Sequence, residues 1–336
     1  MTTTDFAKTL TAFFTRYLAG TRNLSENTIK TYRDAFRQFL EFCKDERSIA
    51  AEKLTFSKIT KQLILDFLSW IEQTRKCSIS TCNQRLAALH SFFRFAQSEE
   101  PSIIQLAQDI ISIRFKEYPK PVLTYLSPEH VKLLLRQPSM STKSGRRNAT
   151  LLSVLYDTGG RVQEICDILV KEVRLDSPAQ ITLKGKGRKV RFVPLMDNTA
   201  SLLKRYIEEN SLYDSGKETS PLFFNQQHEK LTRGGMTYIL QKYAKLAHKI
   251  DPSLPETITP HILRHSKAMH LYQSGSNLVY VRDILGHVDI STTDIYARMD
   301  MNMKRAALEK AYPEIIPTEY SDWSKDDNLM TFLHSL

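Results

Sequence analysis

The sequence has no apolar run close to the 18 residues that a membrane-spanning helix requires, and no N-terminal segment of the charged-then-apolar kind found in secretory signals. It has only four cysteines, whose spacing matches no metal-ligand motif. We therefore expect no membrane partner and no disulfide framework, and the reducing cytoplasm is the expected compartment. The four cysteines are Cys43, Cys77, Cys82 and Cys166.

The composition is that of a globular protein with a basic excess. The 336 residues are 41% hydrophobic and 25% charged, which is enough chain for two ordinary domains. The formal net charge is +10, and the basic excess is spread over both halves. Such a charge suits a protein that grips a polyanion such as DNA from two sides. Many soluble basic proteins share it, so the charge alone leaves the partner open.

Residues 1–113 are predicted to be entirely helical. Apolar residues recur at three- and four-residue spacing in the segments 4–19, 25–47, 57–75, 78–97 and 102–113. Several helix starts carry small polar or basic side chains, which can bind DNA phosphates or can simply cap the helix. The candidate DNA contacts in this part are Ser25, Thr28, Lys30, Ser80 and Arg85.

Residues 114–125 are predicted to be a linker, because two prolines and three basic residues stand in twelve positions. Lys116 and Lys120 could contact phosphates if this segment crosses DNA. A solvated tether between domains explains the same composition.

A sharp turn is expected at residues 157–164, which read D-T-G-G-R-V-Q-E. Two glycines let the backbone turn and leave Arg161 at the start of a new helix. Glu164 follows three residues later on the same face, where it can orient a guanidinium or a neighbouring lysine. A buried structural Arg–Glu pair is the alternative.

Residues 173–195 are predicted to form three short strands, with a hairpin turn K-G-K-G-R-K at residues 184–189. Lys186 is expected at the tip of this turn, where a lysine beside a phosphate could protonate a departing alkoxide. A hairpin that only grips the DNA backbone is the alternative. The flanking candidates for DNA contact are Lys184, Arg188 and Lys189.

Residues 260–298 hold the densest set of reactive side chains. A helix that opens at Pro260 places His261 and Arg264 on one face near an N-terminus that favours anions. We expect this helix to end at Gly275, a second helix to cover residues 278–285, and a third to carry Tyr296. Together with His287 these groups suit a phosphodiester, although each residue alone is ordinary in a protein core.

A zinc site is a weak alternative for the two histidines at positions 261 and 265. Their spacing of four lacks an intervening glutamate, and Arg264 between them would repel a cation. We therefore interpret His265 and His270 as structural, and we expect no metal and no cofactor.

These motifs resemble those of the tyrosine recombinases, the phage-integrase and Xer family. The resemblance rests on H-x-x-R at 261–264, L-G-H at 285–287 and a tyrosine nine residues later. It also rests on T-G-x-R-x-x-E at 158–164 and on the G-K-G hairpin followed by V-R-F-V-P-L. Gly160 departs from the larger apolar residue usual in the family. More loosely, S-x-x-T-x-x-x-Y at 25–32 resembles the family's core-binding domain.

The resemblance implies a mainly α-helical fold. It comprises an N-terminal helical, SAM-like core-binding domain (1–113), a linker (114–125) and an α-rich catalytic domain (126–336) with a small three-stranded antiparallel sheet. The C-terminal helix is expected to exchange between protomers. The implied catalytic set is Arg161, Lys186, His261, Arg264, His287 and Tyr296, with Glu164 in support.

The implied chemistry is metal- and ATP-independent cutting and rejoining of double-stranded DNA through a 3′-phosphotyrosine. The implied site is an inverted repeat, bound by a dimer and recombined in a tetramer within a bacterial-type cytoplasm, beside the nucleoid. The block L-R-H-S-K-A-M-H-L-Y-Q-S-G at 263–275 is most similar to enzymes of transposable elements. A chromosome-dimer resolvase of the Xer type, a type IB topoisomerase and a DNA-binding protein without catalysis are the alternatives.

Overall fold

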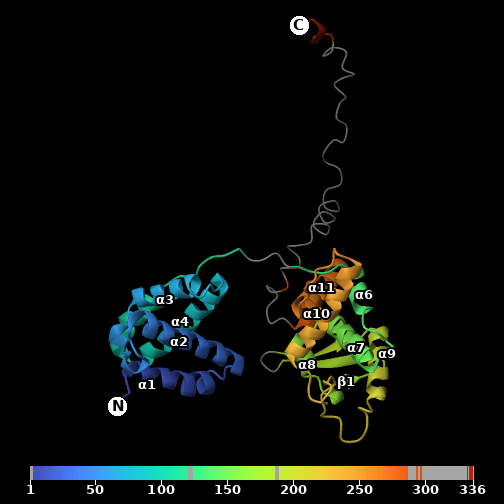
Figure 1. Ribbon diagram of the computed structural model, residues 1–336, viewed down its shortest axis with the longest axis horizontal. Coiled ribbons are helices and arrows are strands. Elements are labelled where there is room, and N and C mark those ends of the chain that lie inside the picture. The colour runs from blue at the N-terminus through green and yellow to red at the C-terminus, as the bar shows by residue number, and fades with distance from the viewer. Residues whose placement is uncertain are drawn as a thin grey trace. The chain divides into compact units, whose positions relative to one another are not determined.

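The computed structural model of the protein describes residues 3–119, 124–185, 189–286, 293, 296, 331 and 333–335. The chain forms two compact units, Met1–Pro121 and Val122–Leu336. The boundary between them falls within the predicted linker, residues 114–125. Figure 1 shows the helices of each unit and the sheet of the second. None of the helices in the described part of the chain combines the length and apolarity that a bilayer span demands.

Every secondary-structure element in the described residues of the first unit is a helix, as predicted. Serine or threonine caps α2, α3 and α4, because each side chain at 25, 60 and 78 accepts a hydrogen bond from the N–H three residues on. Its elements are α1 (Asp5–Ala12), η1 (Phe13–Thr21), α2 (Glu26–Arg47), η2 (Ala51–Lys53), η3 (Phe56–Lys58), α3 (Lys61–Gln73), α4 (Ile79–Glu99), η4 (Pro101–Ile103) and α5 (Ile104–Ile111).

The core of the first unit is a cluster of phenylalanines. The ring of Phe92 lies 5.4 Å from that of Phe13 and 5.1 Å from that of Phe36, both in edge-on contacts. One helix differs from the prediction, since the segment after Ala12 is a π-helix. Its wider turn buries Phe13 and Leu18, five residues apart, in the same core.

The second unit carries the sheet and the remaining described helices. Its elements are α6 (Pro128–Leu135), α7 (Lys143–Thr158), α8 (Val162–Cys166), η5 (Val170–Glu172), β1 (Val173–Arg174), β2 (Gln180–Lys184), β3 (Val190–Pro194), α9 (Asp197–Glu209), α10 (Arg233–Ile250), α11 (Pro260–Gln273) and α12 (Leu278–Leu285). The family-derived expectation of an α-rich unit with one small antiparallel sheet is confirmed.

The sheet has the order β1-β2-β3, and both pairings are antiparallel. Lys184 lies opposite Val190, and the N–H of Gly185 donates to the carbonyl oxygen of Lys189 at 2.7 Å. These contacts close the predicted hairpin around residues 186–188, which lie outside the described residues. Ile181, Leu183 and Val193 point into the core, as the period-two alternation of strands requires.

Two left-handed residues bring the motif segments together. Gly159 (φ +56°) ends α7 and Gly286 (φ +66°) ends α12, and glycine adopts this conformation without the steric cost that a side chain brings. Helix α11 packs against both α7 and α12, and α12 also contacts β3. The turn after α7, the helix with H-x-x-R and the end of α12 therefore meet at one place. The bounds predicted for α12, 278–285, are those observed.

Candidate active site

Arg161 stands where the sequence predicts it, directly before α8. Its Nη1 donates to Oε1 of Glu164 at 2.8 Å, and its backbone N–H donates to Oε2 of the same carboxylate at 2.9 Å. The Arg161 side chain is about one-third exposed, whereas that of Glu164 is buried. The carboxylate thus holds both the backbone and the guanidinium of Arg161 and leaves the guanidinium partly open to a ligand.

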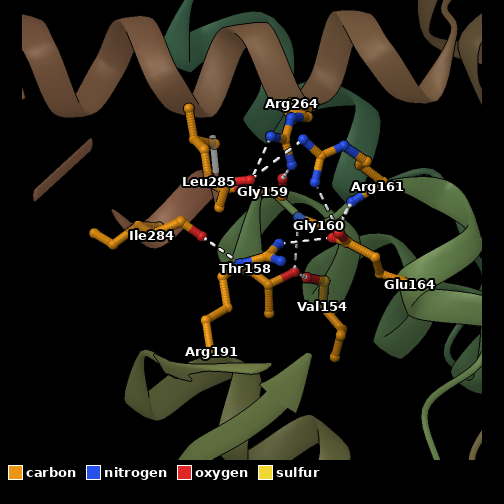
Figure 2. A network of polar contacts seen from close by, with 11 residues as sticks. Val154, Thr158, Gly159, Gly160, Arg161, Glu164, Arg191, Arg264, Ile284 and Leu285 are labelled. Carbon is orange, nitrogen blue, oxygen red and sulfur yellow. Dashed lines mark hydrogen bonds and ion pairs between the residues drawn. The ribbon is translucent and has the colours of Figure 1, made fainter. Parts of the chain in front are cut away.

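Arg264 is buried on α11 and joins the other two motif segments. Its Nη1 donates to the carbonyl oxygen of Gly159 and its Nη2 to that of Leu285, each at 2.7 Å (Figure 2). Burial, reinforced by the nearby positive charge of Arg161, lowers its pKa to about 10. Arg264 therefore remains a cation at neutral pH, and its charge lies among protein dipoles rather than in water.

A third arginine, Arg191 of β3, completes this group. Its Nη2 donates to Oε2 of Glu164 at 2.6 Å, and its Nε donates to the carbonyl oxygen of Ile284 at 2.9 Å (Figure 2). Arg191 belongs to the V-R-F-V-P-L motif, but no role was predicted for it. The signal was available: Arg191 alternates with Val193 on the inward face of a strand, where an unpaired charge is costly.

Three successive carbonyl oxygens at the C-terminal end of α12 each accept a hydrogen bond from an arginine. Arg191 binds that of Ile284, Arg264 that of Leu285, and Nη2 of Arg161 approaches that of Gly286 at 3.4 Å. These carbonyls have no partner within the helix and carry the negative end of its dipole. Three cations from three separate elements are thereby held around one helix end.

Tyr296 is brought to the same helix α11. Its phenolic oxygen lies 2.9 Å from Nδ1 of His265, and its side chain is 1% exposed. Burial raises the pKa of the phenol, and the charge of Arg264 opposes that rise. The prediction that Tyr296 lies near Arg264 thus has geometric support. The histidine in contact, however, is the one that the sequence analysis interprets as structural.

His261 occupies the first turn of α11, where Thr259 caps the helix by accepting from the N–H of Ile262. It is exposed, and its ring lies 6.4 Å from that of His265. Partial burial and the positive charges of Arg264, Arg161 and Arg233 lower its pKa. His261 is therefore a neutral imidazole at pH 7, facing solvent beside a cluster of cations.

Arg233 is a second basic residue that the sequence analysis missed. It begins α10, whose N-terminus is capped by Thr232. Together with Gln163 and Lys230 it lines an open cavity of about 490 Å³. The available signal was the threonine before an amphipathic helix, since free N–H groups at such an end attract anions.

Two of the predicted catalytic residues, Lys186 and His287, lie outside the described residues, as do the candidate contacts Arg188 and Lys120. The remaining hairpin candidates differ in environment. Lys184 forms an ion pair with the buried Glu172, and Lys189 is exposed. Both lysines are exposed, and Lys184 differs in being held by a carboxylate.

Most of the candidate DNA contacts of the first unit have partners within the chain. Ser25 and Thr28 share a 2.9 Å hydroxyl contact in the cap of α2, as the capping alternative predicts. Nε of Arg85 donates to Gln38 at 2.8 Å, and Lys116 is paired with Glu72. Lys30 lies 3.9 Å from Glu26, and Ser80 is half-buried in the first turn of α4.

Among residues 3–119, 124–185, 189–286 and the few described beyond them, no three histidine, cysteine or acidic side chains are arranged to hold a metal ion. The groups gathered at the site are cationic or neutral, with Glu164 as the carboxylate in direct contact with them. This arrangement suits an anionic ligand, whose charge the guanidiniums can match with paired N–H donors.

Comparison with known proteins agrees with this geometry. Residues 124–303 match the phage integrase family, and residues 10–101 match the phage integrase N-terminal SAM-like domain. A Sinorhizobium fredii protein named as an integrase/recombinase, y4rC, is 35% identical over 99% of this chain and 98% of its own length. Tyrosine recombinase XerD of Oceanobacillus iheyensis is 33% identical over 90% of this chain and 97% of its own length.

The fold has a solved counterpart. The structure of XerH site-specific recombinase bound to difH substrate, in a pre-cleavage complex, has a TM-score of 0.63 and 28% identity. The similarity covers 87% of this chain and 81% of that one. Sequence family, relatives and fold agree with the resemblance found in the motifs. The chain belongs to the phage integrase family and is a tyrosine recombinase.

Proposed function

We propose that this recombinase cuts and rejoins double-stranded DNA at a specific site through a 3′-phosphotyrosine formed on Tyr296. The observation that supports the proposal most directly is the placement of the Tyr296 hydroxyl on α11, against His265 and beside Arg264. The same helix presents His261 to solvent, and Arg161 lies across the turn that Arg264 holds.

The proposed roles follow from the charges. A phosphodiester resists attack because its anionic oxygens repel nucleophiles, so positioning and neutralisation supply most of the catalysis. Arg161 and Arg264 would bind the non-bridging oxygens, while His261 would hydrogen-bond the phosphate or relay the phenol's proton. Tyr296 would attack phosphorus, and the 5′-oxygen would leave with a proton from Lys186. The roles of Lys186 and His287 rest on the family motifs alone.

The covalent link conserves the energy of the phosphodiester bond, so rejoining needs no nucleotide hydrolysis. Guanidiniums supply the positive charge, and we expect cleavage to continue in excess EDTA. We further propose that residues 1–113 bind DNA as the core-binding domain, with 114–125 as linker and 126–336 as the catalytic domain. In this proposal inverted repeats are bound by dimers that pair as a tetramer in the bacterial cytoplasm, with the C-terminal helix docking between protomers.

The biological task has two candidates. The motif block at 263–275 favours the recombinase of a mobile element. The similarity to XerD over most of both chains favours a chromosome-dimer resolvase. Inverted repeats that flank the coding sequence would support the mobile element, whereas an isolated chromosomal gene without such repeats would support the resolvase.

Covalent capture tests the chemistry and identifies the target sequence in the same experiment. The full-length protein is incubated with nicked, sheared genomic DNA from its source, and DNA that remains attached under denaturing conditions is sequenced. We expect the wild type to capture a defined sequence. Tyr296→Phe should capture none while retarding the same duplex in a binding assay. An adduct that survives in Tyr296→Phe removes the nucleophile assignment.

The capture experiment also separates the alternative enzyme class. A topoisomerase would relax supercoiled plasmids that lack the captured sequence, whereas a site-specific recombinase would leave them supercoiled. Absence of any adduct with the wild type would overturn the proposed chemistry as a whole.

A further inference from the structure

Arg191 contacts two parts of the proposed site. Through Glu164 it touches the carboxylate that holds Arg161, and through Ile284 it holds the end of α12 that precedes His287. Its side chain is only 12% exposed, so it does not compete with Arg161 for solvent or for a ligand. Arg191 stands within the V-R-F-V-P-L motif, but the family resemblance gave it no place in the catalytic set.

Two glycines pack directly against this arginine and its carboxylate partner. A Cβ built on Gly286 would lie 2.8 Å from Nη1 of Arg191 and 3.0 Å from its Cζ. A Cβ on Gly185, at the base of the hairpin that carries Lys186, would lie 3.1 Å from Oε1 of Glu164. The hairpin base and the end of α12 therefore both pack closely against the Arg191–Glu164 pair. A side chain at either glycine would push the backbone of that segment away from the pair.

The charges explain why a second arginine is needed on Glu164. With Arg161 alone, the buried carboxylate would neutralise the guanidinium that is to bind a phosphate. Burial tends to raise the pKa of Glu164, but hydrogen bonds from Arg191 and Arg161 outweigh it, so the carboxylate stays ionised. Arg191 supplies the compensating charge. Arg161, Arg191 and Arg264 against Glu164 leave a net charge of +2 in this group of contacts.

We propose that Arg191 is a positioning residue of the recombinase. It offsets the charge of Glu164, so that the positive charge of Arg161 is not cancelled and can act on the DNA phosphate. This inference rests on the proposed phosphotyrosine chemistry. The negative charge on the non-bridging oxygens grows as the tyrosine attacks phosphorus, so a loss of net positive charge slows that step more than it weakens binding.

Charge compensation provides the test. Single-turnover formation of the covalent adduct is measured at saturating DNA, using the duplex captured by the wild type. Arg191→Gln lowers the net charge to +1, and we expect adduct formation about 10- to 100-fold slower, with DNA affinity changed less than about threefold. Arg191→Lys keeps the charge and should remain within about threefold of the wild type.

The double variant Arg191→Gln/Glu164→Gln restores the net charge of +2. It should form the adduct at least about tenfold faster than Arg191→Gln. Arg146→Gln is the matched control, because Arg146, at the far end of α7, likewise donates both to a carboxylate, that of Glu209, and to a backbone carbonyl, that of Met140. It should leave the rate unchanged. Thermal unfolding of each variant confirms that the protein is folded.

Three outcomes would overturn the inference. They are a wild-type rate in Arg191→Gln, a slow rate that neither Arg191→Lys nor the double variant recovers, and a loss of DNA affinity equal to the loss of rate. If Arg191→Gln does not fold, a folded Arg191→Lys that is slowed more than tenfold overturns it equally. Failure of the wild type to form any adduct would instead count against the proposed function.

Discussion

The phenolic oxygen of Tyr296 lies 2.9 Å from Nδ1 of His265. His265 directly follows Arg264 in α11. Burial raises the pKa of the phenol, and burial together with His261 and Arg264 lowers that of the imidazole to about 4. Both groups are therefore neutral at pH 7. The proposed nucleophile is buried and protonated in this structure, and the proposed attack on phosphorus would require it to give up this hydrogen bond.

The His265–Tyr296 contact predicts an energetic coupling. Removing either side chain's polar group breaks one partly buried hydrogen bond, so the second removal costs less than the first. In a double-mutant cycle of His265→Phe and Tyr296→Phe, we expect a coupling of about 0.5–1.5 kcal/mol in the free energy of unfolding. Urea denaturation of the four proteins measures it. Strictly additive effects would show that the contact is not formed in solution.

The pKa of His265 predicts how stability depends on pH. Its folded pKa, about 4, lies below the ordinary 6.5, so the unfolded chain takes up a proton more readily. The contribution of the neutral imidazole is complete above pH 6.5 and is lost as pH falls toward 4. Between pH 7.5 and 5.0, the wild type should lose more unfolding free energy than His265→Gln. Equal losses in the two proteins would contradict the assignment.

Alanine substitutions at Gly286 and Gly275 distinguish the effect of backbone strain from the effect of contact with Arg191. Both have positive φ, so alanine at either position should cost about 1–2 kcal/mol of stability. Only at Gly286 does the added Cβ meet another group, the guanidinium of Arg191, whereas nothing lies within 4 Å of one at Gly275. Gly286→Ala should therefore slow adduct formation at least about tenfold beyond Gly275→Ala. Equal rates would mean that the Arg191 contact is not needed.

A buried ion pair between Lys267 and Asp157 joins α11 to the end of α7. Their charged atoms lie 3.2 Å apart, and Oδ2 of Asp157 also accepts from the N–H of Met196. Lys267→Met leaves a buried carboxylate without its cation, and we expect a loss of about 3 kcal/mol in unfolding free energy. In Lys267→Met/Asp157→Asn most of this loss should be regained. A double variant as unstable as the single one would contradict the ion-pair explanation.

Much of the local structure could be predicted because its causes are local. Ser25 and Ser78 cap the helices that they were expected to begin, and α12 ends at residue 285, before Gly286, as expected. The two strands of the hairpin were also predictable, from the alternation of apolar and polar residues and from the glycines of the turn between them. The π-helix from Phe13 was not predicted in this way, and its Phe13 packs against rings of α2 and α4 that are distant in the sequence.

The site was predicted less completely, and the reason is again physical. Arg161, Glu164, His261 and Arg264 belong to short motifs that local spacing can reveal. Arg191 acts on Glu164 from 27 residues away and on Ile284 from 93 residues away, so the strand alternation that marks it as inward-facing does not reveal its partners. The contact between His265 and Tyr296 was not predicted for the same reason, since the two residues are 31 positions apart.

By itself, the amino-acid sequence determined the helices and strands, their caps and turns, and the motif residues available for phosphodiester chemistry, since these depend on neighbours within a few positions. Only the tertiary structure decided that three guanidiniums share one helix end, and that Glu164 is balanced by two of them. It also decided that the Tyr296 hydroxyl rests on His265. Such pairings arise from packing between distant segments, where burial makes each charge and each hydrogen-bond donor depend on its partner.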